Sequence, residues 1–374
     1  MQYRKFGRTE KDVSALGFGA MRLPVKDSES DIDVPAAVEM IRDAIDAGVN
    51  YVDTAYPYHG GNSEVVVGKA LQDGYRDKVF LATKSPIWQI EKTHDFDRIL
   101  DEQFERLQTD HIDFYLLHCV QATFWPKMLD LNVFDWADKA RADGRIGELG
   151  FSFHDNYDVF KQVVDAYDWT FCQIQYNLVN EEVQAGTKGL KYAAEKGLAV
   201  VVMEPLFGGS LANPPDPVQE IWQQTDRRPA DMALQWVWDH PEVSLVLSGM
   251  STLEQVKQNL ESAERSGVNQ LSDQDRALLR QVQDKYRELS PIPCTKCGYC
   301  SPCPNGVNIP LNFELYNNAT LFKGNSQVLC RNLYLGLPES ERAAACEACG
   351  TCEEKCPQHI DIGNLMKRVA EHFS

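Results

Sequence analysis

Four side chains in the N-terminal part of the chain could together transfer a proton to a carbonyl oxygen. Asp53, Tyr58, Lys84 and His118 each stand at, or just after, the end of a short apolar segment of the β-strand type. A phenol is a poor acid at neutral pH, but a neighbouring ammonium favours the phenolate and lowers the phenol pKa. A carboxylate can hold that ammonium, and an imidazole can orient a carbonyl group by a hydrogen bond. Each residue alone is more often a cap or a packing residue, so the prediction depends on finding all four together.

Nine of the eleven cysteines lie between residues 294 and 356, and this clustering predicts a metal site rather than core packing. They include two runs of four, each followed by a proline. The second run has the spacing of bacterial [4Fe–4S] sites, and the first is one residue shorter in its last gap. Zinc is the alternative for any C-x₂-C pair. Because the fourth cysteine usually ligates the other cluster, we expect two [4Fe–4S] clusters. The expected ligand sets are Cys294, Cys297, Cys300 with Cys356, and Cys346, Cys349, Cys352 with Cys303.

A repeating pattern of strands and helices must position the four proton-transfer residues. In the first 285 residues, eight apolar segments alternate with amphipathic helical segments. Continuously apolar strands are typical of parallel sheets that are covered on both faces. Eight such units predict a (β/α)₈ barrel, whose catalytic residues lie at the carboxyl ends of the strands. A doubly wound Rossmann sheet is the main alternative, but no G-x-G-x-x-G follows an early strand. The predicted strands are 15–21, 51–55, 79–85, 112–118, 146–153, 171–177, 199–205 and 243–250, with a further N-terminal strand over 3–6; the predicted helices are 35–47, 63–72, 95–107, 133–142, 155–167, 183–195, 230–239, 253–264, 272–286, 311–321 and 327–335.

A proline-rich break marks the predicted boundary between two domains. Ser290–Pro293 contains two prolines and follows the last helix of the barrel region. We therefore predict a TIM barrel over residues 1–288, followed by a small, mainly α-helical [4Fe–4S] dicluster domain over residues 289–374. The segment 206–228 is rich in Gly, Pro, Asn and Asp, and we expect it to be a long functional or mobile loop.

The motifs D-T-A-x-x-Y, T-K and L-L-H at the ends of the second, third and fourth strands resemble the aldo-keto reductase family and its catalytic tetrad. The resemblance covers the predicted barrel and implies a nicotinamide cofactor, NADH or NADPH, whose hydride goes to a carbonyl carbon. It implies that Tyr58 protonates the carbonyl oxygen, that Lys84 and Asp53 tune Tyr58, and that His118 orients the substrate. Trp88 matches a position that often walls the substrate pocket.

The same resemblance implies cofactor contacts at the ends of the later strands. Ser152 and Gln173 match the residues that bind the nicotinamide carboxamide, and Met203 stands where the family often stacks a tyrosine on the ring. Gly249 and Gln255 replace the Lys and Arg that grip the 2′-phosphate in NADP-binding members, and Lys257, the only base nearby in this segment, is expected to point elsewhere on its helix. We therefore expect NADH to bind at least as tightly as NADPH. The implied cofactor-binding residues are Ser152, Gln173, Met203, Leu206, Gly208, Gly209, Gln255 and Asn259.

Composition and charge exclude some partners. The net charge is −18, and only 8 basic and 9 acidic side chains follow residue 285, so almost all of the excess is on the barrel. Such acidity opposes contacts with a phosphate backbone, so we expect no nucleic-acid partner. No apolar run is long enough to span a membrane, and the N-terminus lacks the apolar segment of a signal peptide. We expect a cytoplasmic protein that acts on a small carbonyl compound.

Three functions are consistent with this combination of domains. In the first, the protein is a carbonyl reductase and its clusters are structural or regulatory, because hydride transfer moves two electrons without them. In the second, the clusters relay electrons between a redox partner bound to the barrel and an external carrier, such as a redox protein. That relay would normally require a flavin, and the sequence holds no specific flavin motif. In the third, the protein is an interaction subunit whose barrel has lost its activity. The presence of all four residues of the catalytic tetrad argues against this function.

Overall fold

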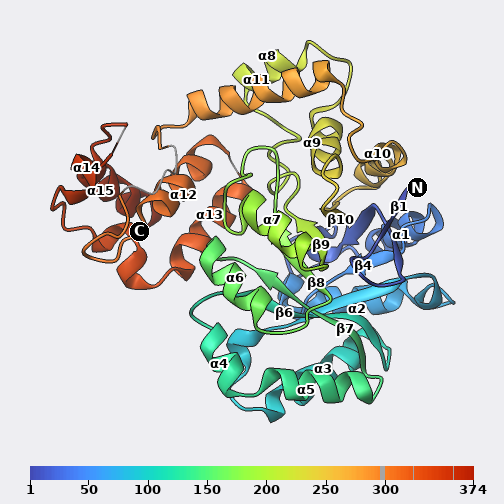
Figure 1. Ribbon diagram of the computed structural model, residues 1–374. Helices are drawn as coiled ribbons and strands as arrows, with labels where there is room; N and C mark the ends of the chain where they lie inside the picture. The colour runs from blue at the N-terminus through green and yellow to red at the C-terminus, as the bar shows by residue number, and fades with distance from the viewer. Residues whose placement is uncertain (295–299, 323, 357) are drawn as a thin grey trace. The chain divides into compact units, whose positions relative to one another are not determined.

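The computed structural model describes residues 1–294, 300–322, 324–356 and 358–374 (Figure 1). These residues form two compact units, of which the first holds 1–205 and 231–271 and the second holds 206–230 and 272–374. The segment 206–228 and the helix after residue 272 therefore pack with the cysteine-rich region, although the boundary predicted from the sequence assigns them to the barrel. That boundary, after residue 288, stays a prediction, because packing alone does not decide to which sequence domain a segment belongs.

The first unit is a closed barrel of eight parallel strands, which confirms the predicted fold. Each strand pairs with the next one along the chain, and the last pairs with the first. The strands are almost completely buried, as expected for a sheet whose inner face forms a core and whose outer face is covered by helices. They are β3 (Leu16–Gly19), β4 (Tyr51–Asp53), β5 (Phe80–Ser85), β6 (Ile112–Val120), β7 (Ile146–Phe153), β8 (Phe171–Gln175), β9 (Ala199–Met203) and β10 (Val243–Gly249).

Helices surround these strands (Figure 1). Their starting points follow local capping chemistry: the side chains of Asp33, Asn156 and Thr252 each accept a hydrogen bond from a backbone N–H in the first turn. The helices are α1 (Val34–Asp46), α2 (Asn62–Ala70), α3 (His94–Leu107), α4 (Trp125–Asp130), α5 (Val133–Ala142), α6 (Tyr157–Asp165), α7 (Gly186–Glu195), α9 (Pro229–Trp238) and α10 (Leu253–Glu264).

An N-terminal hairpin packs against the barrel core. Its strands β1 (Tyr3–Lys5) and β2 (Asp12–Ser14) are antiparallel, and β1 lies within the N-terminal strand predicted over 3–6. Phe6 in its turn is fully buried, and its ring lies 4.4 Å from that of Phe114 and 5.3 Å from that of Phe171. The hairpin therefore adds aromatic side chains to the core cluster that fills the barrel.

The second unit is helical among its described residues. Within 206–228, where the sequence predicts only a loop, α8 (Asp216–Trp222) forms and lies along α11 (Asp273–Leu289), as Figure 1 shows. A capping box between Ser272 and Asp275 starts α11, and the side chain of Asp361 caps the start of the last helix. The remaining helices are α12 (Ile309–Leu321), α13 (Asn325–Gly336), α14 (Thr351–Glu354) and α15 (Ile362–Phe373).

The register of the barrel brings the carboxyl ends of its strands to one rim. Asp53 pairs with Ala82 on the next strand, and Lys84 pairs with Leu116, so their side chains are close to the ends of neighbouring strands. On the opposite side of the barrel Ser152 pairs with Gln173. Parallel strands thus collect polar side chains from distant parts of the sequence at one rim. Among the described residues, no helix is both long and apolar enough to cross a membrane.

Candidate active site and metal centre

Lys84 lies at the centre of a polar cluster on the barrel rim. Its Nζ donates to Asp53 Oδ1 at 2.6 Å, to the carbonyl oxygen of Thr54 at 2.8 Å and to Tyr58 Oη at 3.4 Å. These three bonds use all three N–H donors of an ammonium. Because Tyr58 Oη accepts from Lys84, its own proton is free to be donated elsewhere. The structure therefore brings three of the four predicted catalytic residues into direct contact.

Burial and neighbouring charges shift the pKa values of Tyr58 and Lys84 in opposite directions. Burial raises the pKa of Tyr58, and the nearby Lys84 ammonium lowers it by less, so the net shift is upward. The lowered phenol pKa expected from the sequence is therefore wrong in its net direction, because desolvation outweighs the ammonium. Burial alone would lower the pKa of Lys84, but Asp53 and Tyr58 raise it above its ordinary value. At neutral pH the structure thus holds a charged ammonium beside a protonated phenol.

His118 and Trp88 lie next to Tyr58. The His118 ring meets the Tyr58 ring edge-on at 5.8 Å, and the Trp88 ring is 5.2 Å from the imidazole. Burial, followed by the charge of Lys84, lowers the pKa of His118 well below its ordinary value, so the imidazole is neutral near pH 7. A neutral imidazole can donate one hydrogen bond to a carbonyl oxygen. Trp88 is half-buried beside it, where an apolar wall for a small substrate is expected.

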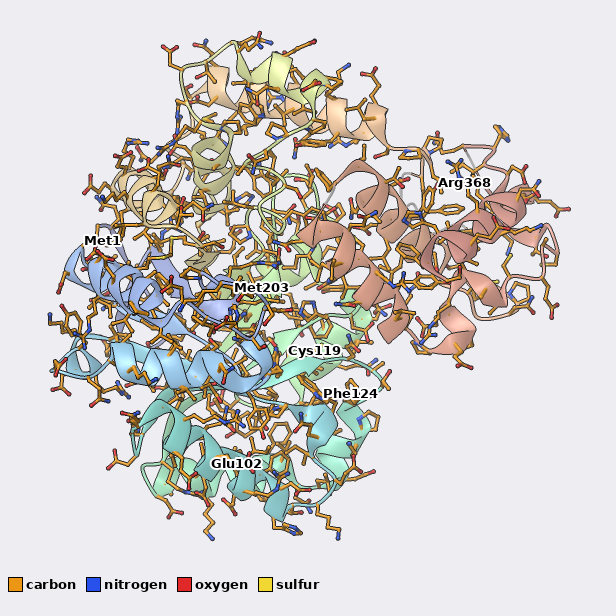
Figure 2. The ribbon with its side chains drawn as sticks, turned by 180° about the vertical axis from the view of Figure 1, so that it is seen from behind. Met1, Glu102, Cys119, Phe124, Met203 and Arg368 are labelled. Carbon is orange, nitrogen blue, oxygen red and sulfur yellow. The ribbon has the colours of Figure 1, made fainter. Side chains whose placement is uncertain are left out.

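Three of the predicted nicotinamide contacts come together on β7, β8 and β9. Gln173 Nε2 donates to Met203 Sδ at 3.5 Å, and Ser152 Oγ accepts from the backbone N–H of Cys119 at 2.8 Å. Gln173 Oε1 is buried and has no hydrogen-bond partner among the described residues. A buried acceptor without a partner is costly, so a ligand that donates an N–H at this position fits the site. Figure 2 labels Met203 and Cys119 on this part of the barrel.

The residues predicted to bind the rest of the dinucleotide are spread over both compact units. On α10, Asn259 is buried and its Nδ2 donates to Ser248 Oγ at 2.9 Å, whereas Gln255 is exposed and its Oε1 accepts from Ser251 N. In the second unit, Leu206 accepts a backbone hydrogen bond from the N–H of Gly209 at 3.0 Å, in a turn that also includes Gly208.

A buried network that the sequence analysis did not single out supports Lys84 and the loop of Tyr58. The fully buried Glu64 carboxylate accepts from Thr83 Oγ1 at 2.6 Å, from Gln103 Nε2 at 2.7 Å and from Arg106 Nη1 at 3.1 Å. Gln103 Nε2 also donates to the Lys84 carbonyl oxygen at 3.1 Å. The Glu64 carboxylate thus ties the end of β5 to α2 and α3. Its only sequence signal is an acidic residue among the apolar positions of a helix.

Replacing Glu64 with Ala is expected to lower the free energy of unfolding of the barrel by about 3 kcal/mol. The change removes the acceptor of two fully buried donor side chains, Thr83 and Gln103, and leaves the Arg106 guanidinium without this carboxylate. Chemical denaturation of the anaerobic protein, followed by circular dichroism, measures the loss. Glu91→Ala is the matched control, because Glu91 is 69% exposed and pairs with Lys127 on the surface. Equal stability of the two variants would contradict the network's role.

A second overlooked residue is His59, which fixes the turn that carries Tyr58. His59 has φ 53°, and its ring is buried between two backbone segments. Its Nε2 accepts from the N–H of Leu23 at 3.2 Å, and its Nδ1 lies 2.6 Å from the carbonyl oxygen of Glu29. The ring therefore bridges the Tyr58 turn to the loop after β3. No spacing or pattern in the sequence marks this contact.

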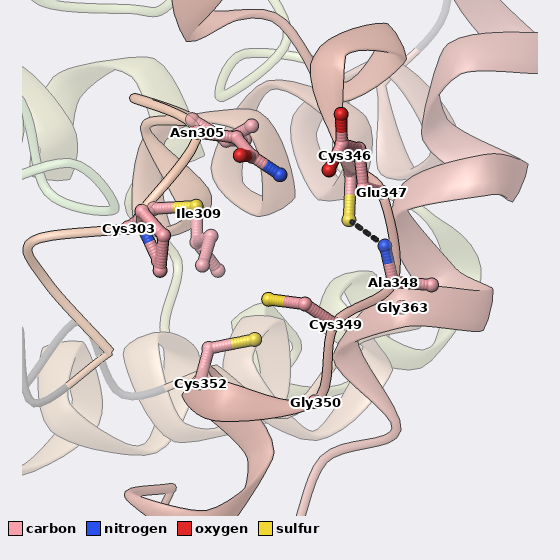
Figure 3. A pocket seen from close by; sticks show the side chains of 12 residues that line it. Cys303, Asn305, Ile309, Cys346, Glu347, Ala348, Cys349, Gly350, Cys352 and Gly363 are labelled. Atoms are coloured by element: carbon pink, nitrogen blue, oxygen red, sulfur yellow. Dashed lines mark hydrogen bonds between the residues drawn. The ribbon is translucent and has the colours of Figure 1, made fainter.

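In the second unit, four cysteines line one pocket (Figure 3). Cys303, Cys346, Cys349 and Cys352 are among the residues that line it, and Figure 3 shows their sulfur atoms directed towards the same space. Burial raises the pKa of the Cys352 thiol to about 11, and the neighbouring Cys346 and Cys303 add to the shift. These are the four residues that the sequence analysis groups as one ligand set. Thiol groups that converge on a common space fit a metal cluster, which needs thiolate ligands from several directions.

The other predicted ligand set is described in part. Cys294, Cys300 and Cys356 are half-buried, and Cys297 lies outside the described residues. Among the described residues, no three His, Cys, Asp or Glu side chains are placed to hold a single metal ion, and this includes the four cysteines of the pocket. The pocket therefore supports a cluster, which is larger than one ion, only as a proposal. Cys330, which the sequence places between the two runs, is buried on α13.

Comparison with known proteins identifies both parts of the chain. Residues 15–284 match the aldo/keto reductase family, and residues 293–360 match the 4Fe-4S dicluster domain. The uncharacterized oxidoreductase YrpG of Bacillus subtilis is 27% identical, over 76% of this chain and 96% of its own length. The NADH-specific methylglyoxal reductase of Escherichia coli is 25% identical, over 74% and 97%.

Solved structures agree with this assignment. The holo form of the aldo-keto reductase AKR11C1 from Bacillus halodurans has a TM-score of 0.64 and 26% identity, and covers 75% of this chain and 96% of its own. An aldo/keto reductase from Klebsiella pneumoniae, in complex with NADP and acetate, has a TM-score of 0.62 and 26% identity, over 76% and 96%. The chain therefore belongs to the aldo/keto reductase family of oxidoreductases, and it carries a 4Fe-4S dicluster domain in its C-terminal region.

Proposed function

We propose that the protein reduces the carbonyl group of a small aldehyde or ketone with NADH or NADPH and uses Tyr58 as the proton donor. The geometry of Lys84 carries this proposal. Its ammonium donates to Asp53, to the Thr54 carbonyl oxygen and to Tyr58 Oη, so the Tyr58 proton is the one left for a substrate. The established family and the printed activity of the methylglyoxal reductase relative are consistent with a small carbonyl substrate.

The nicotinamide, when bound, supplies a hydride with its electron pair to the carbonyl carbon. The chain's own residues supply the proton: the O–H bond of Tyr58 breaks as its proton goes to the carbonyl oxygen, and the alcohol forms. Lys84 then stabilises the phenolate through the hydrogen bond to Tyr58 Oη. His118 orients the carbonyl oxygen by donating a hydrogen bond, and Trp88 walls the pocket beside it. Asp53 holds the ammonium in place throughout.

The cofactor site is proposed on the opposite side of the rim. Gln173 accepts from the carboxamide N–H₂ of the nicotinamide through its unpartnered Oε1, and Ser152 lies beside it on β7. Met203 packs its thioether against the ring. The remaining contacts implied by the family resemblance are assigned to the turn 206–209 and to Gln255 and Asn259.

We further propose that residues 289–374 form the dicluster domain and bind two [4Fe–4S] clusters. The pocket lined by Cys303, Cys346, Cys349 and Cys352 supports one ligand set. The other set, Cys294, Cys297, Cys300 and Cys356, rests on the sequence spacing. We place the protein in the cytoplasm, where thiols remain reduced, and expect no nucleic-acid partner.

The two cysteine runs also favour a second candidate function, in which the clusters relay electrons between a redox partner bound to the barrel and an external redox protein. Anaerobic absorbance spectra of the full-length protein distinguish it from carbonyl reduction. Our proposal predicts that NADH or NADPH alone leaves the cluster absorbance unchanged, and that adding an aldehyde such as methylglyoxal starts nucleotide oxidation. Bleaching of the clusters by nucleotide alone, with no turnover of any aldehyde or ketone, would instead support the relay.

A further inference from the structure

Side chains alternate between the two faces of β7, and this alternation places at the mouth of the barrel one residue that the mechanism does not use. Phe153 lies on the outer face, because its ring packs at 5.0 Å against that of Phe160 on α6. Ser152 and His154 therefore lie on the inner face, with His154 one residue past the end of the strand. The backbone N–H of His154 donates to the Val120 carbonyl oxygen at 3.2 Å, which fixes the residue beside the end of β6.

The neighbouring strand β8 supplies polar side chains at the same levels. Its first residue belongs to the core cluster inside the barrel, so Gln173 and Gln175, two and four residues further along, share the inner face. Ser152 is level with Gln173 in the register of the two strands. His154 and Gln175 therefore form the next layer towards the mouth. Gln175 is buried, and its Oε1 accepts from Nε2 of Gln184 at 3.0 Å, so two amides and one imidazole lie beyond the proposed nicotinamide site.

Two buried polar atoms of this layer lack a hydrogen bond. His154 is half-buried, and its Nδ1 has no partner among the described residues; the same holds for the buried Oε1 of Gln184. Burial lowers the pKa of His154 to about 4, and the neighbouring Gln184 side chain opposes this shift, so the imidazole is neutral near pH 7. Because unpartnered buried polar atoms are costly, the layer fits a ligand that supplies the missing bonds.

The two atoms restrict the chemistry of that ligand. Gln184 Oε1 can only accept a hydrogen bond, so the ligand must donate to it, which a carbonyl or carboxylate oxygen cannot do. The neutral imidazole of His154 has one donor and one acceptor nitrogen, so a hydroxyl group satisfies its Nδ1 in either tautomer. An ammonium group is disfavoured, because Lys84 already places a positive charge near His118, to which His154 is a neighbour. A hydroxyl group, which both donates and accepts, fits both atoms.

We propose that His154 and Gln184 bind a hydroxyl group of the carbonyl substrate, so that the preferred substrates are hydroxyaldehydes and hydroxyketones. This inference rests on the proposed carbonyl reduction and names its substrate class. The hydroxyl group does not react, because the hydride still goes to the carbonyl carbon and Tyr58 still gives its proton to the carbonyl oxygen. The hydroxyl group holds the substrate in one orientation at His118, and a substrate without it leaves two buried polar atoms unpaired.

Steady-state kinetics of the anaerobic full-length protein with matched pairs of carbonyl compounds test this proposal. The pairs are lactaldehyde with propanal and hydroxyacetone with acetone, whose members differ by one hydroxyl group. For the unaltered protein, kcat/KM is expected to be about ten-fold or more higher for the hydroxylated member of a pair. His154→Phe and, separately, Gln184→Met are expected to lower that value about ten-fold and to leave kcat/KM for the other member near normal.

His240→Phe is the matched control. His240 directly precedes the β10 region at the amino ends of the strands, and its ring packs at 4.7 Å against Trp236, a contact that Phe can keep. This variant removes an imidazole from the opposite end of the barrel, so the ratio of the two kcat/KM values should not change.

Three results would overturn the inference. The first is an unchanged ratio in the folded His154→Phe and Gln184→Met proteins. The second is weaker binding of both NADH and NADPH by these variants with no change in the ratio, which would assign the two residues to the cofactor. The third is equal reduction of both members of a pair by the unaltered protein, which would leave carbonyl reduction intact. If the unaltered protein reduces no member of either pair, the proposed function fails and this inference fails with it.

Discussion

Replacing Tyr58 with Phe is expected to lower the rate of carbonyl reduction by a factor on the order of 10² or more. Phe keeps the ring that packs edge-on against His118 but removes the only hydroxyl that Lys84 contacts in the cluster. Without that hydroxyl, the developing negative charge on the carbonyl oxygen has no positioned proton donor. The measurement is kcat/KM for the anaerobic protein with an aldehyde that the unaltered protein reduces.

Tyr56→Phe is a matched control for this loss. Tyr56 lies two residues before Tyr58, but its hydroxyl donates to Glu102 Oε2 on α3, a residue labelled in Figure 2. Removing it deletes the same chemical group outside the site, so turnover is expected to stay near normal. Nucleotide affinity should be unchanged in both variants. Near-normal reduction by the Tyr58→Phe protein would show that the proton comes from another group.

The barrel could be predicted from the sequence because each strand is a largely apolar run and the strands alternate with amphipathic helical segments. All eight predicted strands overlap the observed ones, and β7 matches residue for residue. The helix α8 was missed because 206–228 is rich in residues typical of loops. That helix packs along α11, and a tertiary contact of this kind leaves no periodic signal in a seven-residue segment.

The residues of the site divide in the same way, into those that a sequence pattern marks and those that depend on tertiary contacts. Residues that stand at strand ends could be predicted, because the topology alone places Asp53, Lys84 and His118 on one rim. Glu64 and His59 act through contacts made only in three dimensions: a buried carboxylate shared by three donors, and a ring between two loops. The direction of the Tyr58 pKa shift also required the structure, since it depends on how deeply the phenol is buried.

Anaerobically prepared protein is expected to contain about eight iron atoms per chain, from two [4Fe–4S] clusters. Replacing Cys303 with Ser should remove about half of this iron, namely the cluster held with Cys346, Cys349 and Cys352. The reason is that Cys303 lines the pocket of the second cysteine run although it belongs to the first. Metal analysis together with electron paramagnetic resonance of the reduced protein measures which cluster is lost.

Two further variants make this assignment of ligands testable. Cys356→Ser should damage the cluster of Cys294, Cys297 and Cys300, because the fourth cysteine of each run is expected to cross to the other set. Cys330→Ala, on α13, should leave the iron content unchanged, since this thiol is buried in a helix and does not line the pocket. If Cys303→Ser instead damaged the cluster of its own run, the crossed pairing would be wrong. Zinc in place of iron would overturn the cluster assignment altogether. Zinc binds to four thiolates as a single tetrahedral ion, so its presence would mean that the cysteines do not hold cubanes.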